Sequence, residues 1–168
     1  AEDFRFVQMI GSFPMAVLAR KGLPANNIDE LVALAKKQAA AGKPLTYTGS
    51  SGVGGIFHLT AEQLKRSAGI DLFHVPYKAT GDDLPALLRG DIEFTVSATT
   101  FGLPQVQSGK FRAMAVTTAQ RSPGLPNVPT VNEINPNPGV FWETVNNALS
   151  VDRPYVLPPG TPAAAAIL

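Results

Sequence analysis

The stretch Leu45-Thr46-Tyr47-Thr48-Gly49-Ser50-Ser51-Gly52-Val53-Gly54-Gly55 decides how this chain folds. Its first residues include β-branched and aromatic side chains, which favour a short strand. The glycines that follow predict a turn, because glycine tolerates the backbone conformations that turns require. Apolar residues at Leu59, Leu64 and Ala68 then indicate a helix, which we expect to begin near Val53.

The same alternation of strand and helix continues along the rest of the chain. We expect two extended pieces within 4–19 and further strands at 44–48, 72–77, 92–96 and 111–117. We expect helices from Asn27 to Gly42, between Thr80 and Gly90, and around 103–107. A loop is expected over 122–138, with one helical turn at 131–134, and a return strand within 145–156. Such repeated units predict an α/β fold with a mostly parallel sheet flanked by helices.

The composition of the chain excludes several classes of function. The 168 residues carry a formal net charge of +1 without a basic run, so nucleic acid is not an expected partner. Cysteine is absent and only two histidines occur, so we expect no metal site, and no motif for an organic cofactor is present. With 45% hydrophobic and 16% charged residues, the chain is expected to form a packed core.

The expected strand ends gather polar groups at one edge of the sheet. In a parallel sheet, ligands bind beyond the carboxyl ends of the strands. The four expected ends are Thr48–Gly54, Tyr77–Thr80, Ser97–Thr100 and Thr117–Thr118. They are rich in hydroxyl groups and glycine, and Lys78 supplies their only formal charge. This edge therefore offers mostly neutral hydrogen-bond donors, which suit an anion.

The glycine-rich loop permits two interpretations. A loop that leads into a helix presents free N–H groups and the positive end of the helix dipole, which accept carboxylate or phosphate. Alternatively, it is a tight turn with Ser50 or Ser51 as the N-cap. The phosphate-loop lysine and the dinucleotide glycine spacing are both absent. Gly49 and Ser51 fit a hydrolase nucleophile elbow, but Val53 replaces its last glycine.

The titratable residues near these strand ends are interpreted as structural. His58, one turn into its helix, and His74, in a strand, are expected to be buried or capping residues. Thr80 is expected to cap the next helix, and Asp83 completes an approximate capping box with it. Asp82 and Asp83 are thus interpreted as a charged first helical turn and not as a catalytic pair.

Five stretches of the sequence resemble one known family. The most characteristic is the tetrapeptide Val75-Pro76-Tyr77-Lys78. The other four span 45–52, 109–118, 121–131 and 158–162. Together they resemble the substrate-binding receptors of tripartite tricarboxylate transporters, also called Bug-type receptors, over nearly the whole chain.

The resemblance implies one lobe of a type II periplasmic-binding-protein fold, in which two lobes close around a small organic carboxylate. Such receptors are periplasmic, are not enzymes and deliver the solute to membrane permease subunits. Residues 18–145 then form the second lobe of a longer protein, and 1–17 and 146–168 are hinge segments that cross at Phe4–Val17 and Tyr155–Thr161. The exposed hinge strands of such a fragment are also expected to favour a homo-oligomer.

The resemblance and the loop together define an expected ligand site. Loop N–H groups would hold a carboxylate, hydroxyl groups would add contacts, and Phe13 would form an apolar wall. Ser97 stands where the family often has an aspartate, which argues against an amino-acid ligand. The expected ligand-binding residues are Phe13, Thr48, Gly49, Ser50, Ser51, Gly52, Val53, Gly54, Thr80 and Ser97. Two alternatives stay open: a small esterase that uses Ser51, and an interaction lobe that self-associates.

Overall fold

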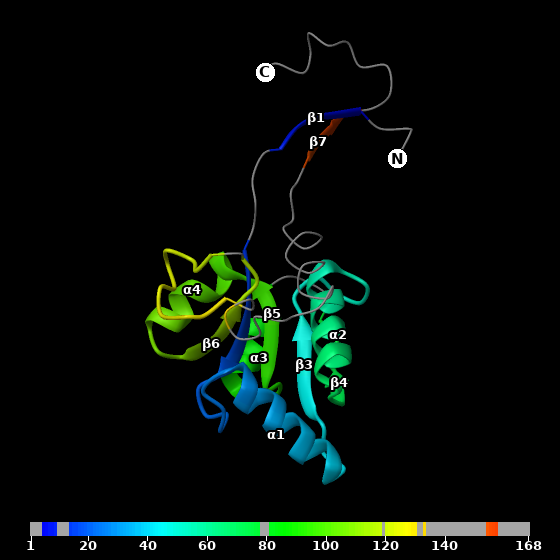
Figure 1. The fold of residues 1–168 in the computed structure, drawn as a ribbon, viewed down its shortest axis with the longest axis vertical. Helices are drawn as coiled ribbons and strands as arrows, with labels where there is room; N and C mark the ends of the chain where they lie inside the picture. Colours follow the sequence, from blue (N-terminus) through cyan, green and yellow to red (C-terminus); the bar gives the residue numbers. More distant parts are fainter. Residues whose placement is uncertain are drawn as a thin grey trace.

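The computed structural model has an α/β fold built on a five-stranded sheet (Figure 1). It describes residues 14–77, 81–118, 120–130 and 133 in full, and residues 5–9 and 154–157 as backbone strands. The sheet contains, in chain order, β2 (Met15–Arg20), β3 (Leu45–Gly49), β4 (Leu72–His74), β5 (Phe94–Ala98) and β6 (Phe111–Val116). Their spatial order is β4-β3-β5-β2-β6.

All strands of this sheet except β2 run in the same direction. β3 pairs parallel with β4 and with β5, whereas β2 pairs antiparallel with both β5 and β6. β6 therefore points the same way as β5. β2 lies between them as a central strand, and its apolar residues are buried, which is typical of a strand covered on both faces. The predicted α/β fold with a mostly parallel sheet is confirmed.

Helices cover both faces of the sheet (Figure 1). They are α1 (Ile28–Ala40), α2 (Ile56–Ala68), α3 (Asp83–Arg89) and α4 (Thr99–Gln107). One core joins α1 and α2 to the face that carries Tyr47 and Phe94. A second core lies on the opposite face, where Leu87 of α3 and Leu103 of α4 contribute. None of the helices in the described part of the chain is long and apolar enough to cross a membrane.

The start of α2 differs from the prediction. The helix begins at Ile56 and not near Val53. Gly52 and Gly54 have φ angles of 76° and 79°, in the left-handed region that glycine tolerates and a right-handed helix does not use. The loop before the helix is therefore longer than expected.

Two further elements differ in length from the prediction. β4 ends at His74 instead of extending over 72–77, although the Val75 N–H still donates to the Tyr47 carbonyl of β3 at 2.8 Å. α4 begins at Thr99, before the expected span of 103–107. Both changes place more of the chain in loop or helix at the carboxyl edge of the sheet.

The first and last described strands pair with each other. β1 (Arg5–Met9) runs antiparallel to β7 (Pro154–Leu157) in a separate two-stranded sheet (Figure 1). Arg5 lies opposite Leu157 and Phe6 lies opposite Val156. The pairing is the one expected of two hinge crossings, and their role as hinges stays a prediction. The rest of the expected return segment, 145–153, lies outside the described residues.

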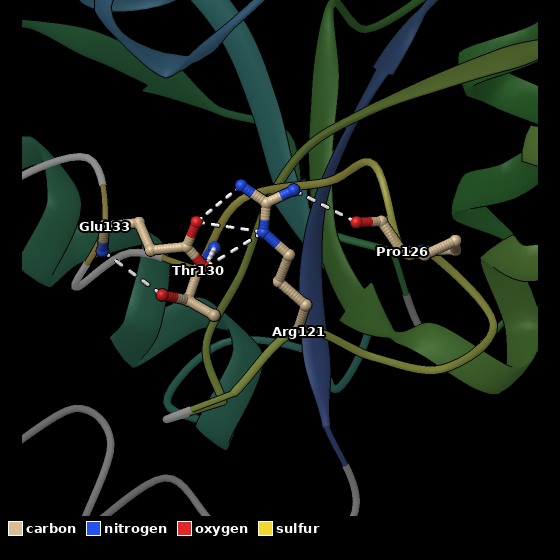
Figure 2. A network of polar contacts seen from close by, with 4 residues as sticks. All are labelled: Arg121, Pro126, Thr130 and Glu133. Carbon is tan, nitrogen blue, oxygen red and sulfur yellow. Dashed lines mark hydrogen bonds and ion pairs between the residues drawn. The ribbon is translucent and has the colours of Figure 1, made fainter.

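The segment after β6 folds back along that strand. Thr130 forms a parallel bridge with Val116, whose N–H donates to the Pro129 carbonyl at 3.0 Å. Figure 2 shows how Arg121 holds this segment by donating to the Glu133 carboxylate and to a backbone carbonyl. The paired hydrogen bonds lower the pKa of Glu133 and raise that of Arg121. This segment thus covers the outer edge of β6 and closes the second core.

Candidate functional site

The carboxyl ends of the parallel strands meet at one edge of the sheet, as predicted. Thr48 of β3 lies opposite Thr95 of β5, and Ser97 lies two residues farther along β5. β2 begins at this same edge, where the Met15 N–H donates to the Thr117 hydroxyl after β6 at 3.3 Å. The expected strand ends at Thr48, Ser97 and Thr117 therefore lie together.

The glycine loop, residues 49–55, uses some of its N–H groups internally and leaves others free. The N–H groups of Gly52 and Gly54 donate to the Gly49 carbonyl at 3.3 Å and to His58 Nδ1 at 3.1 Å. Within the described residues, no acceptor is present for the N–H groups of Ser51, Val53 and Ile56. Ser51 and Val53 are exposed, so a solute can reach this part of the loop.

The start of α2 has no acidic side chain to complement its dipole. Its N-cap is Gly55, which offers no side-chain acceptor, and its first turn holds no acidic residue. The Ser51 hydroxyl accepts the Phe57 N–H at 3.3 Å and so satisfies one of the early donors. A helix start carries roughly half a positive charge. The remaining free N–H groups and this dipole together suit a carboxylate or phosphate.

Asp83 lies in the first turn of α3, as predicted, and its side chain is buried. The N-cap of α3 is the exposed Asp82, whereas Asp83 is 0% exposed. Asp83 Oδ2 accepts the Ser50 hydroxyl at 2.6 Å and the Thr95 hydroxyl at 2.8 Å. Asp83 therefore faces the interior from the first turn of α3. The expectation that Thr80 caps this helix is therefore wrong, because the residue directly before α3 is Asp82; Thr80 itself lies outside the described residues.

Two other hydroxyl groups at this edge are buried without a partner among the described residues. They are Thr48 Oγ1 and Ser97 Oγ, on residues that are 0% and 1% exposed. Alternation along the strands places both on the same sheet face as Thr95. A buried polar group without a hydrogen bond costs about 1–3 kcal/mol. A water molecule or a solute oxygen that reached these hydroxyl groups would relieve that cost.

A polar cluster lies beside the glycine loop, between α2 and the strands. The rings of His58 and His74 lie 4.2 Å apart, and the Tyr47 hydroxyl donates to the Glu62 carboxylate. Burial, followed by the nearby charge of His58, lowers the pKa of His74. Burial and then the bond to Glu62 raise the pKa of Tyr47. His58 accepts the Gly54 N–H, so it caps part of the loop, in line with its structural interpretation.

Three other expected site residues are Phe13, Thr80 and Ser51, and the structure describes only Ser51. Phe13 and Thr80 lie outside the described residues, so their contacts with a solute stay predictions. Ser51 has no histidine hydrogen-bonded to its hydroxyl within the described part of the chain, and its partner there is the Phe57 N–H. Among the residues that the structure describes, no group of three or more histidine, cysteine, aspartate or glutamate side chains could hold a metal ion.

Solved structures that include a periplasmic binding protein share the fold of this chain. The periplasmic binding protein BugD has a TM-score of 0.74 and 29% identity, over 97% of this chain and 50% of its own. R. palustris Rpa4515 with adipate has a TM-score of 0.74 and 27% identity, over 98% of this chain and 51% of its own. A UPF0065 protein of Agrobacterium vitis is 36% identical over 132 residues, which are 79% of this chain and 37% of that relative.

The family follows from a match over almost the entire sequence. The description "Tripartite tricarboxylate transporter family receptor" belongs to the family model that matches residues 1–162. The chain is a member of this family, which confirms the resemblance seen in the sequence. The chain spans about half the length, or less, of the relatives named above, with 50%, 51% and 37% covered.

Proposed function

We propose that this chain is the solute-binding part of a periplasmic receptor and that the glycine loop holds one carboxylate of an organic acid. The observation that carries the proposal is the set of N–H groups on Ser51, Val53 and Ile56, which have no acceptor among the described residues. They lie at the start of a helix that no acidic side chain complements. An anionic solute supplies what this helix start lacks.

The proposed solute is a small dicarboxylate or tricarboxylate. R. palustris Rpa4515, which has 27% identity to this chain, was solved with adipate. The edge of the sheet here offers N–H and hydroxyl donors, and the buried hydroxyl groups of Thr48 and Ser97 lack partners in the described part of the chain. The family description supports delivery of this solute to membrane permease subunits. Phe13 and Thr80 complete the proposed contact set.

The proposed domain organisation places the site between two lobes. Residues 18–145 form one lobe, and the segments 1–17 and 146–168 contain the hinge crossings. The antiparallel pairing of β1 with β7 and the coverage of about half of the relatives support this organisation. The site at the carboxyl edge of the sheet then forms one wall of the cleft, and the other lobe supplies the second wall.

Calorimetry on the intact receptor tests the proposed function. The panel consists of adipate, shorter dicarboxylates, a tricarboxylate, an amino acid and inorganic phosphate. We expect at least one di- or tricarboxylate to bind and the amino acid and phosphate not to bind. Failure of every carboxylate in the panel would contradict the proposal. Hydrolysis of a generic ester that disappears in Ser51→Ala would favour the esterase alternative, and a mass that rises with concentration would favour the self-associating lobe.

A further inference from the structure

Asp83 links three parts of the molecule at the carboxyl edge of the sheet. Its Oδ2 accepts the Ser50 hydroxyl of the glycine loop at 2.6 Å and the Thr95 hydroxyl of β5 at 2.8 Å. Its Oδ1 accepts the Gly81 N–H, in the turn before α3, at 3.2 Å. A single carboxylate therefore ties two loops of the site to a central strand.

Burying the Asp83 carboxylate costs free energy. Asp83 is 0% exposed, and it forms no salt bridge within the described part of the chain. Burying a carboxylate without a cation is unfavourable unless several donors surround it. Its three donors come from Ser50, Thr95 and Gly81, so the arrangement that keeps the charge inside also fixes those three groups relative to one another.

The sheet itself does not depend on Asp83 for its hydrogen bonds. The Thr95 hydroxyl also has the Thr48 carbonyl within 3.2 Å, and the Ser50 hydroxyl has the Val96 carbonyl at 3.4 Å. Both hydroxyl groups can therefore keep an acceptor on the strands without Asp83. Loss of Asp83 would then remove the link between the glycine loop and the turn at Gly81 while leaving β3 and β5 paired.

We infer that Asp83 is a positioning residue, which holds the glycine loop and the turn at Gly81 in the arrangement that receives the solute. It acts through Ser50, because the next residue in the chain, Ser51, carries the first of the free N–H groups. The consequence for binding rests on the proposed function, whereas the consequence for loop order does not.

The test compares Asp83→Ala and Asp83→Asn with Asp82→Ala in the intact receptor. Asp82 is a matched control, since it is the neighbouring acid, is exposed and makes no side-chain capping bond. The first readout is hydrogen exchange of the loop amides 50–56 without ligand, measured against the amides of β2. The second is the Kd for adipate. Asp83→Asn keeps the shape and one acceptor oxygen, so it tests the inference even if Asp83→Ala does not fold.

In Asp83→Ala we expect loop amides to exchange about tenfold faster while β2 amides change little, as a local opening requires. We expect the Kd to rise roughly tenfold to a hundredfold, the equivalent of one charge-assisted hydrogen bond. Asp83→Asn should lie between Asp83→Ala and the parent, and Asp82→Ala should match the parent. Equal acceleration in β2 and the loop, or unchanged loop exchange in both Asp83 variants, would overturn the inference. A parent that binds no carboxylate would instead refute the proposed function, and loop exchange would still decide the role of Asp83.

Discussion

The starts of α1 and α2 differ in whether a capping side chain and an acidic residue complement their free N–H groups. Every α-helix begins with N–H groups that lack partners within the helix. At α1, Asn27 Oδ1 accepts the Glu30 N–H at 2.9 Å, and the Glu30 carboxylate accepts the Asn26 N–H at 2.8 Å. At α2, the N-cap is Gly55, and the first turn has no acidic residue. The first turn of α1 thus contains carboxylates that complement the helix dipole, and the first turn of α2 contains none.

The positions of the two helix starts explain the difference. The start of α1 lies at the amino edge of the parallel strands, where Arg112, near the start of β6, donates to the Ala25 carbonyl at 2.6 Å. The start of α2 follows β3 directly and lies at the carboxyl edge. Ligands of parallel sheets bind at the carboxyl edge. A capped helix start thus occurs where no ligand is expected, and an open one occurs where a solute is proposed to bind.

The largest expected effect is the loss of stability in Gly49→Ala. A Cβ atom at Gly49 would lie 2.3 Å from His58 N and 2.6 Å from Phe57 C, both backbone atoms of α2. Overpacking of this kind costs about 3 kcal/mol when the neighbour cannot move. Gly42, at the end of α1, is the control, because a Cβ atom there would have no atom within 4 Å and only its φ of +73° is unfavourable. We expect Gly42→Ala to lower the free energy of unfolding by about 1 kcal/mol. Urea denaturation measures both, and equal losses would contradict the close approach of α2 to β3.

The next effect concerns solute affinity in His58→Glu. His58 occupies the third position of α2, which corresponds to Glu30 in α1. A carboxylate at His58 would accept the free loop N–H groups and repel an anionic solute. We expect the affinity for adipate to fall roughly tenfold to a hundredfold, as for the loss of one charge-assisted hydrogen bond. His58→Gln is the neutral control and should stay close to the parent in calorimetry. An unchanged affinity in His58→Glu would mean that the solute binds elsewhere.

A smaller effect is expected from Asn27→Ala at the start of α1. Loss of this capping side chain should lower the free energy of unfolding by about 1 kcal/mol. Affinity for adipate should stay unchanged, since this helix start lies at the opposite edge of the sheet. Denaturation and calorimetry on the same sample measure the two quantities. If Asn27→Ala weakened adipate binding by a free energy equal to its loss of stability, the claim that only the start of α2 binds the solute would be contradicted.

The smallest effect is a difference in acid sensitivity between the two regions. Folding lowers the pKa of His74 below its usual 6.5, chiefly by burial, so the neutral form is favoured in the folded protein. The contribution of neutral His74 to the free energy of unfolding should be fully present above about pH 6.5. It should be lost as the pH falls through the pKa of His74 in the folded protein. Folding lowers the pKa of Glu30 below 4.5, so its contribution is lost only at more acidic pH. His74→Gln should reduce the loss of stability between about pH 7 and pH 5, whereas Glu30→Gln should leave that loss unchanged. Thermal melts across this range measure both, and parallel profiles for the parent and His74→Gln would contradict the assignment.

Sequence patterns predicted the fold well because the main signals are local and repeated. The apolar spacing of Ile28, Leu31 and Ala35 after Asn27 predicted α1, and these three residues are buried. Parallel strands place their carboxyl ends on one edge regardless of loop detail, so Thr48 and Ser97 were expected at the site edge. The start of α2 was predicted wrongly, because a glycine-rich sequence does not specify where positive φ angles give way to helix.

Asp83 shows why the site was harder to predict than the fold. Asp82 and Asp83 are identical neighbours, and only the rotation of α3 decides which one faces the interior. Asp83 shares a helix face with the buried Ala86 and Leu87, and that spacing was the signal available in the sequence. Two of its three donors, the hydroxyl groups of Ser50 and Thr95, lie on other elements, so no local pattern could reveal them.

The most direct test of the account is an amide NMR titration of the intact receptor with adipate. Hydrogen bonds from N–H groups to a carboxylate move the amide proton signals downfield. We expect the largest shifts at Ser51, Val53 and Ile56, and none at Asp29 and Glu30 in the self-capped start of α1. Saturating shifts located elsewhere, with the amides of Ser51, Val53 and Ile56 unmoved, would contradict the claim that the open start of α2 receives the carboxylate.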